Sequence, residues 1–101
     1  MPSYSLAVPP TVVLRWRNRT VPARPLALRG DEACLVLDAP PPVETPIHLV
    51  LGWPCGGTTV LDARLREVAL DGQTARVDVC GVTGDWEPFL RYLGERAAHE
   101  P

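Results

Sequence analysis

The stretch that decides the fold runs from Thr58 to Cys80 and reads TTVLDARLREVALDGQTARVDVC. From Leu61 to Leu65, apolar residues alternate with charged ones, which is the period of two of a strand with one buried face. Asp71-Gly72 follows, and this dipeptide favours the left-handed backbone of a tight hairpin turn. The alternation resumes from Ala75 to Val79. The stretch therefore predicts a long β-hairpin.

One amphipathic helix is predicted after the hairpin, over about residues 85–98. Its apolar residues recur at offsets of three and four, which places them on one face. They are Trp86, Phe89, Leu90, Leu93 and Ala97. Asp85 is placed to cap the amides of the first turn, and Pro88 fits a turn whose N–H groups lack partners within the helix. We expect the apolar face to cover the open end of a sheet.

The earlier part of the chain adds shorter strands. A first strand is predicted to begin near Thr11, and two further strands are predicted over Ala33–Leu37 and Ile47–Trp53. Pro40–Pro42 is expected to form a stiff connector between these two strands. Pro22 and Pro25 restrict the segment between the first two strands to an edge or an irregular crossing. The fold class is mainly β: an antiparallel barrel of five to six strands, closed or nearly closed, with a C-terminal α-helix as a plug. An open sheet that dimerises through its edge is the alternative.

Length and composition indicate one domain. A chain of 101 residues supports a single core, which we place at residues 11–98, after a flexible N-terminal leader at residues 1–10. A hydrophobic content of 46% and a net charge of -2 argue against disorder and against a general polyanion-binding surface, so we expect no nucleic-acid partner. Without a membrane span or a secretory signal, we expect a cytoplasmic protein and no membrane insertion.

The residues that could carry metal or covalent chemistry are few. Cys34, Cys55 and Cys80 form no Cys-x-x-Cys pair, and His48 and His99 are too scattered to complete a ligand set, so we expect no metal. A thiol couple of Cys34 or Cys55 with His48 is conceivable. No sequence context marks a nucleophile beside a base, however, and we expect the protein not to be an enzyme.

All ten cationic residues are arginines. Arg15, Arg17 and Arg19 occupy alternate positions and would share one side of an extended segment. A guanidinium group binds phosphate through two parallel hydrogen bonds and stacks on bases. These three arginines are therefore candidate ligand-binding residues.

The order of segments from Leu14 to Gly94 resembles the PilZ family, small bacterial β-barrels known as cyclic di-GMP receptors and as adaptors in motility and surface behaviour. The segments that carry the resemblance are Ala33-Cys-Leu-Val-Leu37, the proline connector, Ile47 to Trp53, Arg64-Leu-Arg-Glu-Val68, Ala75-Arg-Val-Asp-Val79 and Trp86-Glu-Pro-Phe-Leu-Arg-Tyr-Leu93.

The resemblance implies two ligand motifs. Arg15 and Arg19 fit the first, Arg-x-x-x-Arg. The second needs Asp or Asn, then Ser two residues later and Gly three further on; Asp31 fits, but Ala33 and Val36 replace the hydroxyl and the glycine. The resemblance therefore implies impaired or absent cyclic di-GMP binding, and no cofactor is expected.

The function we favour is a non-enzymatic bacterial regulatory or adaptor protein of PilZ type, a monomer or homodimer that contacts another protein of a signalling or motility system. Trp16 and Trp53 are its candidate anchors, because tryptophan is frequent in binding hot spots. The alternative is a cyclic di-GMP receptor with the ligand-binding residues Arg15, Arg17, Arg19 and Asp31.

Overall fold

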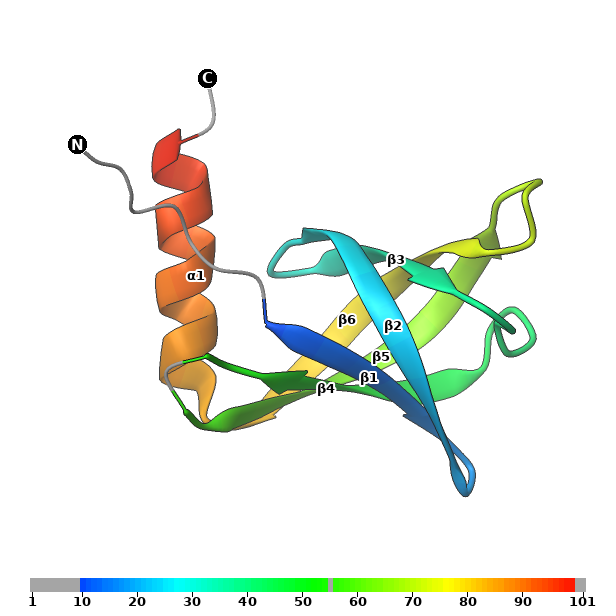
Figure 1. Cartoon of the computed structure of the whole chain (residues 1–101), viewed down its shortest axis with the longest axis horizontal. Coiled ribbons are helices and arrows are strands. Elements are labelled where there is room, and N and C mark those ends of the chain that lie inside the picture. The colour runs from blue at the N-terminus through cyan, green and yellow to red at the C-terminus, as the bar shows by residue number, and fades with distance from the viewer. Residues whose placement is uncertain (1–9, 55, 100–101) are drawn as a thin grey trace.

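The computed structural model describes residues 10–54 and 56–99. Its elements, in chain order, are β1 (Thr11–Trp16), β2 (Arg19–Leu28), β3 (Glu32–Leu37), β4 (Pro46–Gly52), β5 (Thr58–Val68), β6 (Thr74–Gly84) and α1 (Trp86–His99). The predicted mainly β domain with one C-terminal helix is confirmed (Figure 1). The leader predicted at residues 1–10 lies, except for the buried Pro10, outside the described residues.

The six strands form a closed barrel in the order β1-β2-β3-β6-β5-β4. Every neighbouring pair is antiparallel, and β1 pairs with β4 to close the barrel. Closure removes the free edges through which a sheet would dimerise, so the open-sheet alternative is wrong.

The segment with Pro22 and Pro25 is a full strand of ten residues that pairs with β1 on one side and β3 on the other. The expectation of an edge strand is therefore wrong, and the irregularity that was expected as the alternative is confined to one bulge. The register shifts between Pro25 and Ala27, and such a bulge accommodates a residue without a backbone N–H.

The barrel interior is filled by the inward residues of the alternating strands, as the sequence pattern predicted. Both arms of the β5–β6 hairpin contribute, and Asp71-Gly72 lies in its turn, where Gly72 has a φ of 74°. The fully buried large side chains are Leu14, Leu35, Leu37, Ile47, Leu49, Leu51, Thr59, Leu61, Leu65, Val77 and Phe89.

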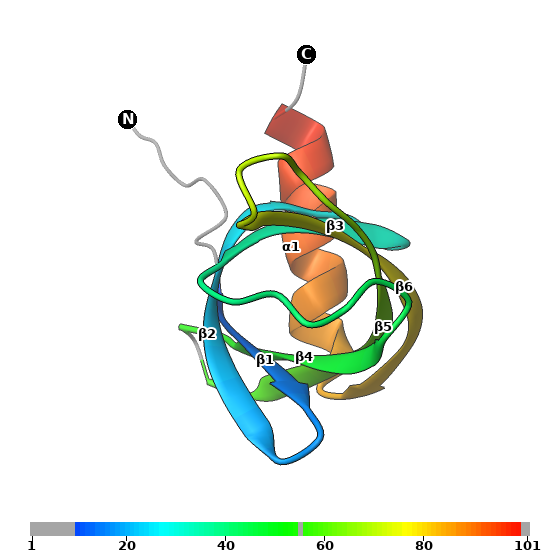
Figure 2. The same cartoon turned by 90° about the vertical axis from the view of Figure 1, so that its right-hand side faces the viewer.

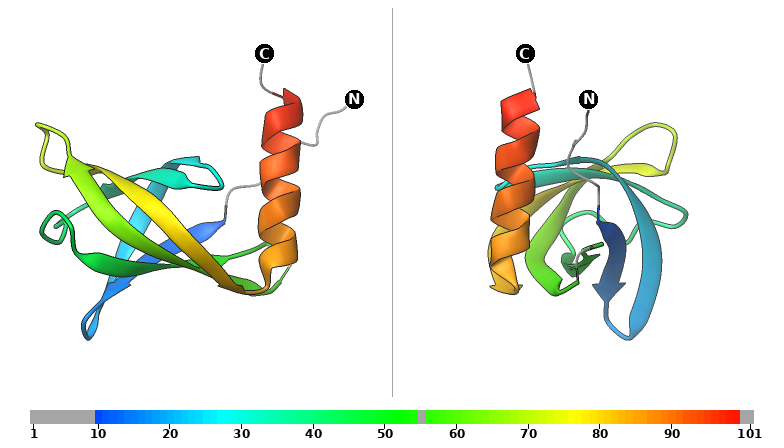
Figure 3. Two further views of the ribbon diagram at one scale, coloured as in Figure 1. Left: turned by 180° about the vertical axis from the view of Figure 1, so that it is seen from behind. Right: turned by 60° about the vertical axis from the view of Figure 1, so that its left-hand side comes forward.

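The two ends of the barrel are covered differently. The β3–β4 connection, which contains Pro40–Pro42, crosses the end opposite α1 (Figure 2). Backbone hydrogen bonds fix it to β5, because Glu44 N–H donates to the Leu65 carbonyl at 2.7 Å and Leu65 N–H donates to the Thr45 carbonyl at 3.1 Å. The helix α1 lies across the other end of the barrel (Figure 3).

The side of α1 that faces the barrel is set by Trp53. Its ring lies 6.4 Å from the ring of Phe89 and 5.6 Å from that of Tyr92, measured between centroids, and Leu93 packs against the same core. Trp86 and Leu90 are 58% and 54% exposed, so their predicted place on the buried face is wrong. Each helical residue turns the side chain by about 100°, which carries Leu90 away from the face that Phe89, Tyr92 and Leu93 share.

Candidate functional site

The predicted ligand arginines lie on the β1–β2 hairpin, but not on one extended segment. Arg15 belongs to β1, Arg17 closes the turn with a φ of 55°, and Arg19 begins β2. Arg15 is paired with Thr20, and Arg19 with Trp16, which is the inward neighbour of Arg15. Because cross-strand partners share a face, Arg15 and Arg19 belong to opposite faces of the hairpin. The expectation that the three arginines share one side is wrong, since the turn interrupts the strand.

Asp31 lies at the other end of β2, in the β2–β3 turn. A ten-residue strand spans roughly 30 Å, so the structure does not bring Asp31 together with Arg15, Arg17 and Arg19. The Asp31 carbonyl accepts a hydrogen bond from Val79 N–H at 2.9 Å. Ala33, at the second motif position, is 2% exposed and points into the barrel. The Asp31 motif therefore does not complete a site with the hairpin arginines.

Two of the arginines nevertheless line one recess, which we call the β1 hollow. It measures about 390 Å³ and is lined by Arg15, Trp16, Arg17, Pro46, His48 and Val60. Sequence reasoning found the first three and missed His48, although the alternation of β4 already placed it on the outer face. There it stands beside Arg15 in the register, and its Nε2 lies 3.1 Å from Asp62 Oδ1.

The two predicted tryptophan anchors differ. Trp53 is only 8% exposed, and its indole N–H donates to the hydroxyl of the buried Thr59 at 2.8 Å. Trp53 as an interaction anchor is therefore wrong, because it is a core residue. Trp16 is half-buried, and the guanidinium carbon of Arg17 lies 5.1 Å from its ring centroid, within the range of a cation–π contact.

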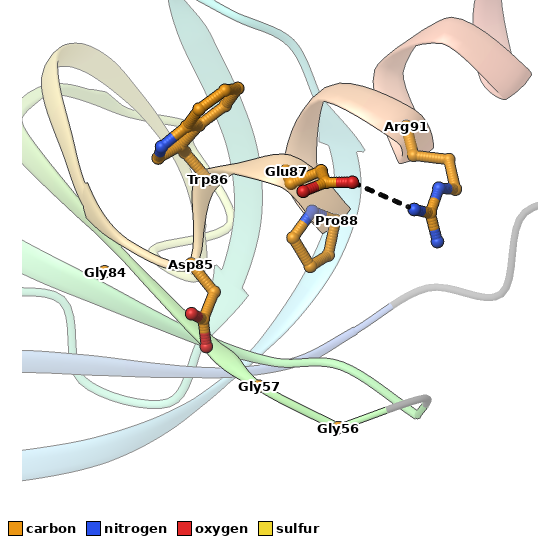
Figure 4. A pocket seen from close by; sticks show the side chains of 8 residues that line it. All are labelled: Gly56, Gly57, Gly84, Asp85, Trp86, Glu87, Pro88 and Arg91. Carbon is orange, nitrogen blue, oxygen red and sulfur yellow. Dashed lines mark hydrogen bonds and ion pairs between the residues drawn. The ribbon is translucent and has the colours of Figure 1, made fainter.

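The exposed tryptophan is Trp86, at the start of α1. Trp86 and Leu90 lie one helical turn apart, and we call this pair the helix patch. The sequence pattern placed both residues on the buried face, because they fit the apolar period. In the structure, Tyr92 lies beside Phe89 on that face instead. A hollow of about 400 Å³ adjoins Trp86 (Figure 4). Its lining residues are Gly56, Gly57, Gly84, Asp85, Trp86, Glu87, Pro88 and Arg91.

The base of this hollow is held by Asp85. Thr58 N–H donates to Asp85 Oδ2 at 2.9 Å, and Asp85 N–H donates to the Thr58 carbonyl at 2.8 Å. The hydroxyl of Thr59 also donates to the Asp85 carbonyl. The predicted cap is thus wrong: the carboxylate accepts from the first residue of β5, and Pro88 stands at the third helical position, where an N–H would otherwise meet it.

The structure does not bring Cys34 and His48 together as a thiol couple. Cys34 lies on β3 and His48 on β4, which are not neighbours in the barrel, and Cys55 lies outside the described residues. Within residues 10–54 and 56–94, whose side chains the structure describes, no three His, Cys, Asp or Glu side chains gather as a metal site. Over residues 10–54 and 56–99, no helix is long and apolar enough to cross a bilayer.

Comparison with known proteins adds no relative: no protein-family model, curated protein or solved structure matches the chain. The resemblance to the PilZ family therefore stays a hypothesis that rests on the sequence segments.

Proposed function

We propose that the chain is a non-enzymatic regulatory or adaptor domain of PilZ type, which contacts another protein through the helix patch. The observation that carries the proposal is the exposure of Trp86 and Leu90, at 58% and 54%, on adjacent turns of one helix. We place its action in the bacterial cytoplasm, in a signalling system that controls motility or surface behaviour.

The helix patch has the composition of a small interface centre. Tryptophan is enriched among residues whose truncation weakens protein complexes, and such residues work best when a recess and a polar rim surround them. The hollow beside Trp86 supplies a recess, and the ion pair of Glu87 with Arg91, at 3.5 Å, supplies a charged rim. The opposite side of α1 is fixed by Phe89 in the core, so a partner meets a preorganised surface.

The barrel with its terminal helix also agrees with the fold that the PilZ resemblance implied. Ala33 is buried where the family uses a serine, and Asp31 is remote from the hairpin arginines. Both features support a PilZ-type domain that acts through protein contacts with impaired cyclic di-GMP binding.

The test is co-purification from bacterial cells with the tagged full chain. We expect a partner that the wild type retains and that Trp86→Ala/Leu90→Ala loses. Leu26→Ala/Val43→Ala is the matched control, because these side chains are also about half exposed, at 52% and 50%. Recovery of the same proteins with both variants, or of no partner with the wild type, contradicts the proposal.

A second candidate function is the cyclic di-GMP receptor, which the β1 hollow favours because Arg15, Trp16 and Arg17 line it together. Guanidinium groups and an indole ring suit the phosphates and guanines of the dinucleotide. Titration calorimetry of the wild type beside Arg15→Ala/Arg17→Ala, which removes both arginines that line the hollow, decides this question. Heat that only the wild type releases favours the receptor, and silence of both proteins removes it.

A further inference from the structure

The arginines without acidic neighbours lie in one part of the sequence. The first 30 residues contain five arginines and no Asp or Glu, whereas residues 31–101 contain five arginines and all twelve acids. The formal charges of the two parts are thus +5 and -7, which together give the net charge of -2. The whole-chain charge, from which we expected no nucleic-acid partner, averages two regions of opposite sign.

The structure separates the two sets of arginines by their contacts as well. Arg64, Arg66, Arg76 and Arg91 each lie within 4.0 Å of a carboxylate oxygen. Among the described residues, no ion pair involves the other set, which is Arg15, Arg17, Arg19, Arg24 and Arg29. Four members of this second set, Arg15, Arg17, Arg19 and Arg24, lie on β1, β2 and their turn, and we call them the basic hairpin; Arg29 lies beyond β2, in the β2–β3 turn. The guanidinium groups of the basic hairpin are exposed and available to an anion.

An aromatic surface lies within the basic hairpin. Trp16 is half-buried under the guanidinium of Arg17, and the β1 hollow beside them has about 390 Å³ and no acidic lining residue. The carboxylate of Asp62 lies beside His48, and its Oδ1 is 3.1 Å from His48 Nε2. The volume falls within the roughly 300 to 1,000 Å³ of small-molecule sites, so the hollow admits a base.

From this arrangement we infer that the basic hairpin binds single-stranded nucleic acid. Arg15 and Arg24, which the register places on the same outer face, contact phosphates, and Arg19 contacts a further phosphate at the tip, while one base stacks on the Trp16–Arg17 pair in the β1 hollow. Proteins that bind single strands combine these two elements, a basic track along the backbone and an aromatic platform for bases. The tip of the hairpin points away from α1, so this surface is separate from the helix patch (Figures 1 and 3).

Other anionic partners fit the hairpin less well. An acidic peptide would use the charges but not the stacked ring. A bilayer would require apolar side chains at the tip, where Arg17, Asn18, Arg19 and Thr20 are exposed and polar. A duplex keeps its bases inside and would leave the β1 hollow empty.

The experiment measures the fluorescence anisotropy of a labelled single strand of about 12 nucleotides, as RNA and as DNA, with the full chain in about 50 mM salt. We expect binding that weakens as salt rises, and a loss of about tenfold or more in Arg15→Gln/Arg17→Gln/Arg19→Gln. The slope of log affinity against log salt should fall by about 1.4 in this variant, since each of the two lost phosphate contacts, those of Arg15 and Arg19, contributes about 0.7.

The matched control is Arg64→Gln/Arg66→Gln/Arg76→Gln, which removes the same charge from the paired set. Circular dichroism confirms that both variants fold, and Arg24→Gln provides a second, milder change of the hairpin. Preserved affinity in the control with loss in both hairpin variants supports the proposal. Equal losses in hairpin and control variants, or no binding of either strand by the wild type, overturn it.

The remaining arms separate the kinds of anion. A duplex of the same sequence, a polyglutamate peptide, vesicles with phosphatidylserine and cyclic di-GMP are measured alongside. If any of these binds more tightly than both single strands, the proposal is wrong. Trp86→Ala/Leu90→Ala should bind the strand like the wild type, so failure here is distinguishable from failure of the proposed protein contact.

Discussion

The indole N–H of Trp53 donates a 2.8 Å hydrogen bond to the hydroxyl of Thr59, and that hydroxyl donates in turn to the Asp85 carbonyl. Trp53 follows β4, Thr59 lies in β5, and Asp85 directly precedes α1. Through this relay, the end of β4 and the start of β5 hold Asp85, and with it the point at which the helix begins. The orientation of α1, and with it the exposure of the helix patch, depends on the relay.

The first prediction is that Thr59→Val destabilises the protein by about 1 to 3 kcal/mol, because it leaves the buried indole N–H of Trp53 and the partly buried Asp85 carbonyl without their partner. Urea unfolding followed by circular dichroism measures this loss. Thr58→Val is the control, since the Thr58 side chain is exposed and its backbone contacts with Asp85 remain. Equal unfolding free energies for the two variants would contradict the structural role of the Thr59 hydroxyl.

A second prediction concerns Gly84, where the chain passes from β6 to Asp85. Its φ is 77°, and a Cβ there would lie 2.7 Å from the Thr58 carbonyl oxygen. Gly72 has a similar φ of 74°, but a Cβ would meet nothing within 4 Å. Gly72→Ala should therefore cost about 1 to 2 kcal/mol from backbone conformation alone.

Gly84→Ala bears the same conformational cost and a clash with backbone that cannot rotate away. We expect the free energy of unfolding of Gly84→Ala to be lower than that of Gly72→Ala by about 1 kcal/mol or more. Thermal and urea unfolding of the two variants side by side give this difference. Identical losses would mean that the Thr58 carbonyl does not approach Gly84 so closely.

The third prediction uses the turn of the β5–β6 hairpin. The Thr74 hydroxyl donates to the Asp71 carboxylate at 2.6 Å, and the amides of Thr74 and Gln73 each donate at 2.8 Å. These hydrogen bonds, that of the Thr74 hydroxyl first, lower the pKa of Asp71 below its ordinary value of 3.8. A lowered folded-state pKa means stabilisation that is present above pH 3.8 and is lost as the pH falls through the folded value.

Asp71→Asn should accordingly be less stable than the wild type at neutral pH, and the difference should shrink in acid. Urea unfolding at intervals from about pH 7 to about pH 2.5 follows it. Asp38→Asn, which removes an exposed acid from the β3–β4 connection, controls for the loss of one charge. If both variants show the same pH dependence, the turn hydrogen bonds do not stabilise the hairpin.

The strands were predictable because one face of each is buried in the barrel, and a period of two is the direct record of that burial. Ile47, Leu49 and Leu51 show it plainly, as do the arms of the β5–β6 hairpin. The proline-containing β2 was misread because the sequence does not reveal a bulge that accommodates Pro25 within a paired strand.

The surfaces were harder to predict, since they depend on contacts between distant segments. Alternate positions made Arg15, Arg17 and Arg19 look like neighbours on one face, but the turn at Arg17 divides them. Trp53 and Trp86 have the same residue type and opposite surroundings. Only the relay to Thr59 and the packing on Phe89 distinguish the core tryptophan from the exposed one.

The last prediction tests which face of α1 covers the barrel. Phe89 is 2% exposed and contacts the Trp53 ring, whereas the adjacent Leu90 is 54% exposed. Phe89→Ala should reduce the unfolding free energy by about 3 to 5 kcal/mol, because it leaves a cavity under the helix. Leu90→Ala should change it by no more than about 0.5 kcal/mol, since its side chain lies on the surface. Urea unfolding of the neighbouring variants measures both effects in the same helical turn. A large loss in Leu90→Ala would return Leu90 to the buried face that the sequence pattern predicted, and would remove half of the helix patch on which the proposed protein contact depends.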